Sequence, residues 1–286
     1  MPAPTSKPNP KRQNMKTVTF LLLAVSALPV SAAMIAYYPL DADFNDQSGN
    51  GNHATQRGIV TINTASTAVG GGAAAFNNGV NGGGANVLSV NDGAGGLNLT
   101  SLPVFTMSIW FNSTVDQTDR RIFAEGSSAS TNPLYTLGTG TPAAANGQFN
   151  FYRRTSGGAV TNNHETAPGQ IFETGTWNNA VWVDQAGLVN LYLNGVFARS
   201  YTYADTDLSV NTTSFGGILR AAPLAGYTGL LDDIGIWNEA PANPAAFAQA
   251  IFAGAAANTV AIGIPEPTTG ALSLILAGGL LARRRR

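Results

Sequence analysis

The sequence predicts an all-β domain, a sandwich or a barrel, on three observations. Short apolar bursts alternate with polar residues from residue 35 to residue 237, and clusters of Gly, Asn, Ser and Pro separate them. The helix formers Lys, Glu and Gln are scarce in this stretch. An Asn-Gly pair joins two of the bursts, as in a tight β-hairpin. Repeated short strands without a helical period favour this class of fold.

The individual elements follow from the spacing of apolar residues. Alternate apolar side chains over residues 105–111 predict a strand with one buried face, and residues 149–152 repeat the pattern. In residues 180–183 we interpret the two valines as the buried side. Residues 189–197 contain Asn-Gly at their centre and predict a hairpin. One helix is expected, over residues 244–252, with Asn243 as its cap.

The two ends of the chain are predicted to be targeting signals. Residues 1–33 read as a signal peptide: a basic stretch precedes an apolar run over residues 18–30, and small residues fit cleavage after Ala32 or Ala33. Met15 is an alternative start, and a buried helix at the edge of a domain is the alternative interpretation. Residues 34–253 then form the sandwich, and residues 254–264 a linker.

The last 22 residues have three parts in order. These are Pro265-Glu266-Pro267, the apolar stretch 268–282, and Arg283, Arg284, Arg285 and Arg286. This order resembles the PEP-CTERM sorting signal. The resemblance implies a short hydrophobic membrane helix, processing by an exosortase, and a place at the surface or in the polysaccharide matrix of a Gram-negative-type bacterium. An ordinary tail anchor fits the same pattern.

Charge and cysteine usage exclude several functions. Between Ala33 and Ile264, seven arginines, no lysine and fifteen acidic residues leave a formal charge of −8. Such a domain repels nucleic acid and anionic polymers, so we expect no nucleic-acid partner. The chain has no cysteine, which excludes disulfides and thiolate chemistry.

Several landmarks within the predicted sandwich resemble the LamG-like family of concanavalin A-like domains. They are Tyr38-Pro39-Leu40-Asp41-Ala42-Asp43, the turn 46–53, the strand 105–110, the pair 176–179 and 191–195, and the closing strand 227–238. The resemblance covers about 200 residues, from 38 to 238. It implies a two-sheet antiparallel jelly-roll sandwich and says little about the ligand.

Aspartates are the candidate metal ligands. Asp232 shares its alternation with the apolar residues Ile234 and Ile236, and an inward carboxylate needs a partner. Related domains often hold calcium near this strand, so we expect calcium bound by Asp232 with Asp43 or Asp41. The alternative is that backbone N–H groups or an arginine satisfy Asp232.

Aromatic residues are the candidate ligand contacts. Trp110, Tyr152 and Trp182 fall opposite the predicted core side of their strands, and Arg153 follows Tyr152. Exposed rings beside polar groups are typical of sugar sites on β-sandwiches. The alternative is that another strand or loop covers them.

The sequence favours a non-catalytic surface or matrix protein that contacts polysaccharide or another protein. Related glycoside hydrolases carry a Glu-x-Asp-x-x-Glu strand, which this chain lacks. A carbohydrate-active enzyme (a hydrolase or lyase) of another type and a purely structural surface protein remain the alternatives.

Overall fold

The computed structural model describes residue 1 and residues 34–260, except 80–82, 84–85, 141–146, 167–171 and 205–207. The chain divides into Met1–Val30 and Ser31–Arg286, and the described helices and strands all belong to the second unit. The predicted signal peptide and sorting signal lie outside the described residues. Among the residues that are described, no helix has the length and apolar character needed to cross a membrane.

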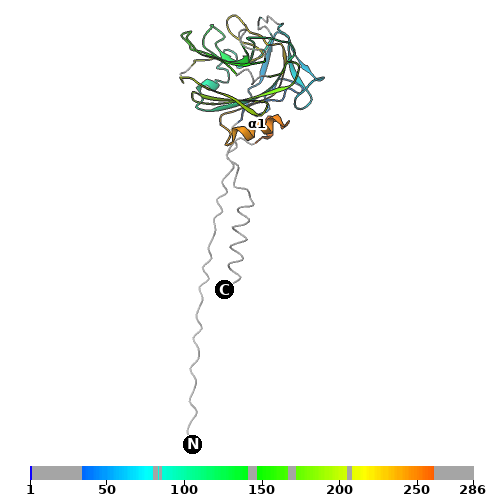
Figure 1. Ribbon diagram of the computed structural model, residues 1–286, viewed down its shortest axis with the longest axis vertical. Helices are drawn as coiled ribbons and strands as arrows, with labels where there is room; N and C mark the ends of the chain where they lie inside the picture. Colours follow the sequence, from blue (N-terminus) through cyan, green and yellow to red (C-terminus); the bar gives the residue numbers. More distant parts are fainter. Residues whose placement is uncertain are drawn as a thin grey trace. The chain divides into compact units, whose positions relative to one another are not determined.

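Two antiparallel sheets stack face to face around one core (Figure 1). Sheet A contains, in order, β13 (Val196–Thr202), β12 (Leu188–Leu193), β11 (Asn178–Gln185), β6 (Phe105–Ser113), β15 (Gly229–Trp237), β4 (Ala73–Phe76) and β3 (Val60–Asn63), with β1 (Met34–Tyr38) paired to β15. Sheet B contains β10 (Val160–Glu165), β9 (Phe149–Arg154), β8 (Leu134–Thr139), β7 (Arg121–Gly126), β14 (Thr212–Phe215), β5 (Val87–Val90) and β2 (Ala54–Arg57). The predicted two-sheet sandwich is confirmed.

The alternation in β6 is confirmed, whereas our interpretation of β11 is wrong. Phe105, Met107, Ile109 and Phe111 all point into the core between the sheets. In β11, Trp182 pairs with Met107 and therefore points inward with it, so the two valines point outward. Both sides of β11 are apolar because α1 (Pro244–Phe252) covers the outer side.

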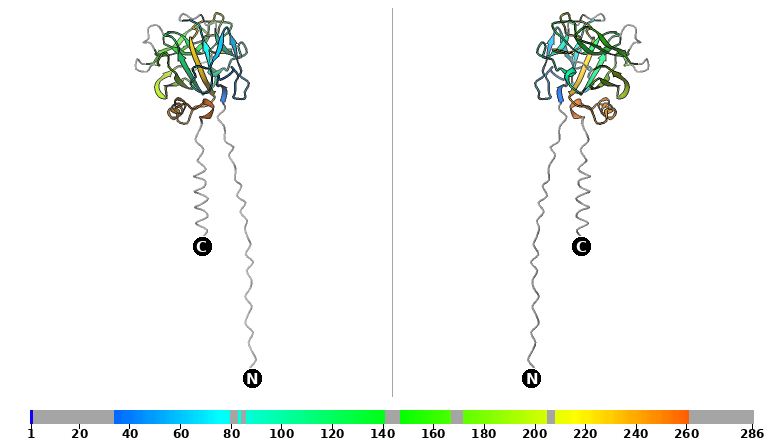
Figure 2. Two further views of the ribbon diagram at one scale, coloured as in Figure 1. Left: turned by 90° about the vertical axis from the view of Figure 1, so that its right-hand side faces the viewer. Right: turned by 90° about the vertical axis from the view of Figure 1, so that its left-hand side faces the viewer.

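The predicted helix and hairpin are both confirmed. α1 begins after Asn243, whose side chain accepts a hydrogen bond from Ala246 N at 3.1 Å. It packs on the outer face of sheet A, and Figure 2 shows it outside the two layers of strands. In the β12–β13 hairpin, Asn194 and Gly195 have φ values of 50° and 76°, as a type I′ turn requires.

The first and last described elements meet at one side chain. Asp233 accepts a hydrogen bond from the Tyr37 hydroxyl of β1 and another from Ala257 N of the short helix η2 (Ala257–Thr259), each at 2.8 Å. Both ends of the domain are thereby attached to strand β15.

Candidate functional site

Two of the four residues predicted as ligand contacts are covered tryptophans. Trp182 is fully buried in the core, where its Nε1 donates to the Tyr135 hydroxyl at 2.6 Å. Trp110 does lie on the outer side of sheet A, but it is buried beneath α1 and stacks on Phe252 at 5.8 Å. The prediction that these two rings are displayed is therefore wrong.

The other two residues separate to opposite sides of β9. Arg153 shares the inward side with Phe151, is buried, and lies 4.6 Å from the ring centre of Tyr203. Arg153 therefore does not lie beside Tyr152 on the outer face as a ligand contact there would require, because strand alternation carries neighbours to opposite faces. Tyr152 lies on the outer face of sheet B and is partly exposed.

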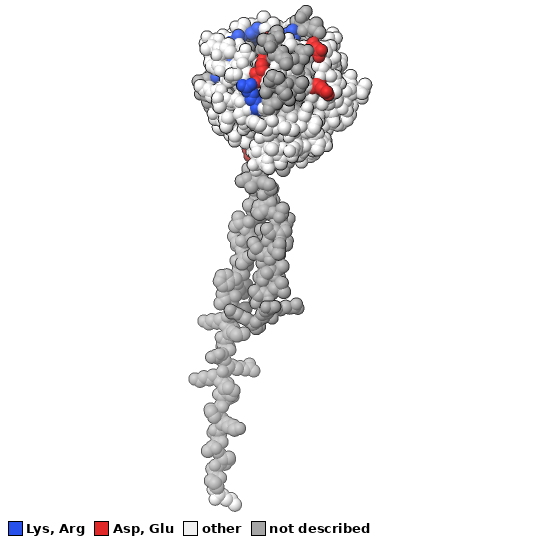
Figure 3. Space-filling model, viewed as in Figure 1, with Lys and Arg blue, Asp and Glu red and all other residues white. Residues whose placement is uncertain are grey.

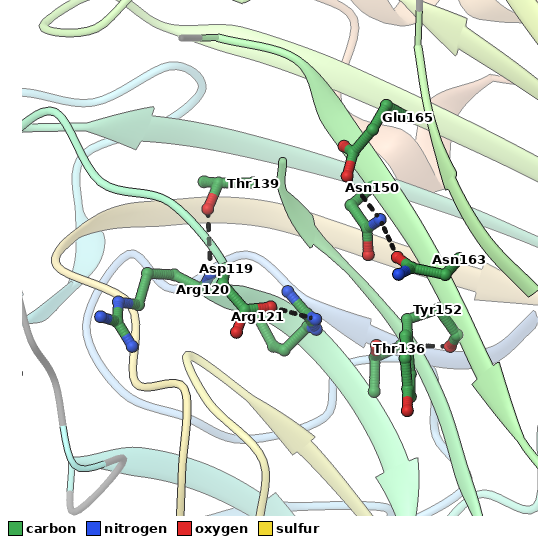
Figure 4. A network of polar contacts seen from close by, with 9 residues as sticks. All are labelled: Asp119, Arg120, Arg121, Thr136, Thr139, Asn150, Tyr152, Asn163 and Glu165. Atoms are coloured by element: carbon green, nitrogen blue, oxygen red, sulfur yellow. Dashed lines mark hydrogen bonds and ion pairs between the residues drawn. The ribbon is translucent and has the colours of Figure 1, made fainter. Parts of the chain in front are cut away.

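Tyr152 belongs to a polar surface formed by β7, β8, β9 and β10. Cross-strand pairing brings two outward rows together, Arg121–Gly138–Asn150–Glu165 and Ala124–Thr136–Tyr152–Asn163. We call Arg121, Thr136, Asn150, Tyr152, Asn163 and Glu165 the polar face; Figure 4 shows these six side chains. Sequence analysis found Tyr152 alone, because the others come together only through strand pairing.

Asn150 joins β9 to β10 within the polar face. Its Nδ2 donates to Asn163 Oδ1 at 3.0 Å and to Glu165 Oε1 at 3.1 Å. Its Oδ1 is buried and has no hydrogen-bond partner within the described part of the chain. An unpaired buried acceptor is costly, so the hydrogen-bonding capacity of the polar face is not fully used by the described residues.

Arg121 supplies unpaired donors on the same face. It is only 5% exposed, its Nη2 donates to Asp119 Oδ1 at 2.6 Å, and its guanidinium lies 5.8 Å from the centre of the Tyr152 ring. Among the described residues, its Nε and Nη1 have no acceptor. Gly138 permits this arrangement, since a Cβ there would lie 1.8 Å from the carbonyl oxygen of Arg120.

A small apolar cluster on the outer face of sheet B packs against Tyr152. The ring packs against Ala124, Leu134, Ile218 and Ala225, the last two from a segment that folds over the outer face. Arg121 N donates to the carbonyl of Ala225 at 2.9 Å and fixes that segment to β7. Tyr152 is therefore held in place with part of its ring accessible.

Asp232 lies at a bulge in β15, and the prediction that it faces the core with Ile234 and Ile236 is wrong. The register with β6 shifts between Asp232 and Gly235, and Asp233 has a φ of 43°. Asp232 consequently shares the outer side with its cross-strand partner Trp110.

N–H groups surround the three aspartates predicted to bind calcium. Asp232 Oδ2 accepts from Ala68 N at 2.8 Å and Val69 N at 3.0 Å. Asp41 Oδ1 accepts from the next residues of that loop, Gly71 N and Gly72 N. Asp43 accepts from Asn45, whose backbone N lies at 2.9 Å. In the described ranges no three acidic or histidine side chains gather as a metal site, and calcium stays an untested prediction.

We call the contact of Asp232 with the backbone N–H groups of Ala68 and Val69 the loop clamp. Burial raises the pKa of its carboxyl group. Desolvation, followed by the neighbouring charge of Asp233, raises the pKa of Asp232 to about 7, although the two loop N–H groups oppose the rise. The Oδ1 atom of Asp232 is buried and lacks a partner among the described residues. Desolvation also raises the pKa of Asp233.

Two antiparallel sheets around a single core define a jelly-roll β-sandwich. Residues 81–244 match the model of Laminin_G_3, the concanavalin A-like lectin/glucanases superfamily, and the chain belongs to this superfamily. The predicted family resemblance is thus confirmed for the sandwich. A search of the curated proteins finds no match.

Solved structures share the fold at low sequence identity. Domain 4 of AbnA, a GH43 extracellular arabinanase from Geobacillus stearothermophilus in complex with arabinotriose, is 21% identical with a TM-score of 0.54, covering 72% of this chain and 93% of that one. The binding domain of botulinum neurotoxin DC in complex with SialylT is 12% identical with a TM-score of 0.54, covering 77% and 51%. The binding domain of Paraclostridial Mosquitocidal Protein 1 is 14% identical with a TM-score of 0.52, covering 77% and 52%. This chain spans about half the length of the two toxin domains, and identities this low show the fold alone.

Proposed function

We propose that this chain is an exported, non-catalytic polysaccharide-binding protein of the cell surface or extracellular matrix, with the polar face of sheet B as its contact surface. The observation that carries the proposal is the supported, partly exposed Tyr152 beside the unpaired polar atoms of Arg121 and Asn150. A ring stacks on the apolar face of a sugar, while donors and acceptors at its edge bind hydroxyl groups. The arabinotriose complex of the similar arabinanase domain supports the choice of ligand class.

The described carboxylates near the core have structural partners, which supports a role without catalysis. Glu125 is fully buried and accepts from Leu99 N at 3.0 Å, Thr100 N at 3.1 Å and the Thr213 hydroxyl at 2.9 Å. Asp232 accepts hydrogen bonds from the loop that contains Ala68. Asp233 accepts hydrogen bonds from Tyr37 and Ala257 at the two ends of the domain. An enzyme of this fold is the alternative, and release of reducing ends from any polysaccharide that binds would favour it.

Native gel electrophoresis through gels containing a soluble polysaccharide tests the proposal. We expect the full-length chain to be retarded by at least one polymer of a panel of neutral and acidic polysaccharides. Tyr152→Ala should reduce the retardation, with roughly a tenfold loss of affinity for one stacked ring.

The control variant is Phe197→Ala, which removes a ring that is 49% exposed on sheet A. It should bind like the unchanged chain. Absence of binding to every polymer would overturn the proposal and favour a purely structural surface protein. Equal losses from both variants would place the contact surface elsewhere.

A further inference from the structure

The arginines of the domain are concentrated around the polar face. Of the seven in the sequence between Ala33 and Ile264, three lie at or beside Tyr152, and a fourth, Arg120, is the chain neighbour of one of them. Arg120 directly precedes β7 and Arg121 begins it. Arg154 ends β9 on the same side as Tyr152, and Arg220 comes from the segment that folds over the sheet. We call these four residues the arginine cluster. Figure 3 shows most of the charged side chains of that view, basic and acidic alike, in the half of the sandwich away from α1.

The guanidinium groups of the cluster are close enough to influence one another. Burial, and then the positive charge of Arg154, lowers the pKa of Arg220. Burial also lowers the pKa of Arg120, and Arg121 adds to that effect while Asp119 opposes it. Within the described ranges, the carboxylates that contact the cluster or the polar face are Asp119, which pairs with Arg121, and Glu165 at the β10 end of the polar face. Among these described groups, positive charge is in excess around Tyr152.

Some donors of the cluster are buried and unused. Besides the Nε and Nη1 atoms of Arg121, the Nε of Arg154 is buried with no acceptor among the described residues. The Nη2 of Arg154 donates to the carbonyl of Thr131, which holds the side chain over the outer face. A guanidinium presents its donors in a rigid fork that fits the two oxygens of a carboxylate. Arg154 and Arg220 are partly exposed, so their guanidinium groups can present this fork to an anionic ligand at the surface.

We infer that the arginine cluster binds the carboxylate groups of an acidic, uronate-containing polysaccharide, while Tyr152 stacks on the ring of a neighbouring sugar. This inference rests on the proposed function and specifies its ligand class. The formal charge of −8 between Ala33 and Ile264 does not prevent such binding. At physiological ionic strength, charges more than about 8 Å away are largely screened, so the bound group responds mainly to the cluster.

Affinity measurements on the full-length chain test the inference. The probes are polygalacturonate, its neutral counterpart galactan, and dextran sulfate, which distinguishes carboxylate from sulfate. We expect polygalacturonate to bind at least tenfold more tightly than galactan, and its affinity to fall as salt is added. Arg154→Gln combined with Arg220→Gln should cost roughly tenfold or more in affinity for polygalacturonate while leaving galactan unaffected.

Arg57→Gln is the matched control, because it removes one exposed arginine from β2 at the opposite edge of sheet B. It should bind polygalacturonate like the unchanged chain. Equal affinity for polygalacturonate and galactan, or equal losses from Arg57→Gln and the double variant, would overturn the inference and leave the proposed function standing. Preference for dextran sulfate would overturn the carboxylate assignment. Failure to bind any polysaccharide would overturn both proposals.

Discussion

At the scale of single residues, Asp232 shows how the chain handles a buried charge. Its carboxylate is enclosed between the bulge of β15 and the loop containing Ala68 and Val69. Two N–H groups reduce the desolvation cost of the ionised form, and the pKa of about 7 indicates that they do not remove it. The clamp is therefore sensitive to pH near neutrality.

Asp232 should make the chain less stable as pH rises. Between about pH 4 and pH 7 the folded chain retains a proton on Asp232 that the unfolded chain has released, so the free energy of unfolding falls across this window and levels off above it. The melting temperature of Asp232→Asn should equal that of the unchanged chain near pH 4 and exceed it by several degrees at pH 8. Melting curves from pH 4 to pH 8 measure this, with Asp43→Asn at an exposed position as the control. Parallel curves for all three proteins would contradict it.

The same residue tests the calcium prediction made from the sequence. If Asp232 binds calcium with Asp41 or Asp43, millimolar calcium should raise the melting temperature relative to EDTA, since a ligand of the folded state stabilises it. Asp232→Ala should abolish the rise. An unchanged melting temperature would leave the clamping of the loop as the role of these carboxylates.

At the scale of elements, α1 determines what sheet A exposes. Phe247, Ala248 and Ile251 bury the outer side of β11 and the Trp110 ring. Without α1, these strands would present apolar side chains on both faces. Sheet B has no such helix over its polar face in the described residues, which is why the candidate site lies there.

Breaking α1 should uncover Trp110 without affecting polysaccharide binding. Ala248→Pro places proline in the helix interior at a cost of about 3 kcal/mol and should shift tryptophan fluorescence to the red. Ala245→Pro, in the first turn, is the matched control because proline is tolerated there. A weaker affinity for polysaccharide in Ala248→Pro than in Ala245→Pro would contradict the assignment of the site to sheet B.

The positions of strands and helices were predicted better than the side of each strand that points into the core. In β6 a single apolar side identifies the core, and the prediction held. In β11 both sides are apolar, so the alternation does not distinguish Trp182 in the core from the valines under α1. The bulge after Asp232 leaves no mark in the apolar pattern. The polar face depends on which strands pair, and Arg121 and Asn150 are separated by another strand.

At the scale of the whole molecule, net charge and local charge lead to different expectations. The formal charge of −8 predicted repulsion of anionic polymers, yet Arg121, Arg154 and Arg220 lie around Tyr152. Acidic residues elsewhere on the sandwich then favour one orientation of the molecule towards an acidic polymer.

Export is the prediction that concerns the entire chain. Mass spectrometry of protein recovered from the surface of a host with an exosortase should show loss of residues 1–32 or 1–33 and of the tail after Pro265-Glu266-Pro267. Replacing Arg283, Arg284, Arg285 and Arg286 with glutamine should leave the tail attached, since cationic residues keep that end cytoplasmic. Retention of the signal peptide inside the cell would contradict export.

The attachment of both domain ends to Asp233 has a mechanical consequence. A pulling force applied at residue 260 is resisted first by the hydrogen bond from Ala257 to Asp233 and by the packing of α1. It then reaches β15, which lies between β6 and β4 inside sheet A. Strands β7 to β10 belong to the other sheet. If the domain is pulled between its C-terminal end and a polymer on the polar face, the load crosses from sheet A to sheet B, and the contacts of η2 and α1 bear it first.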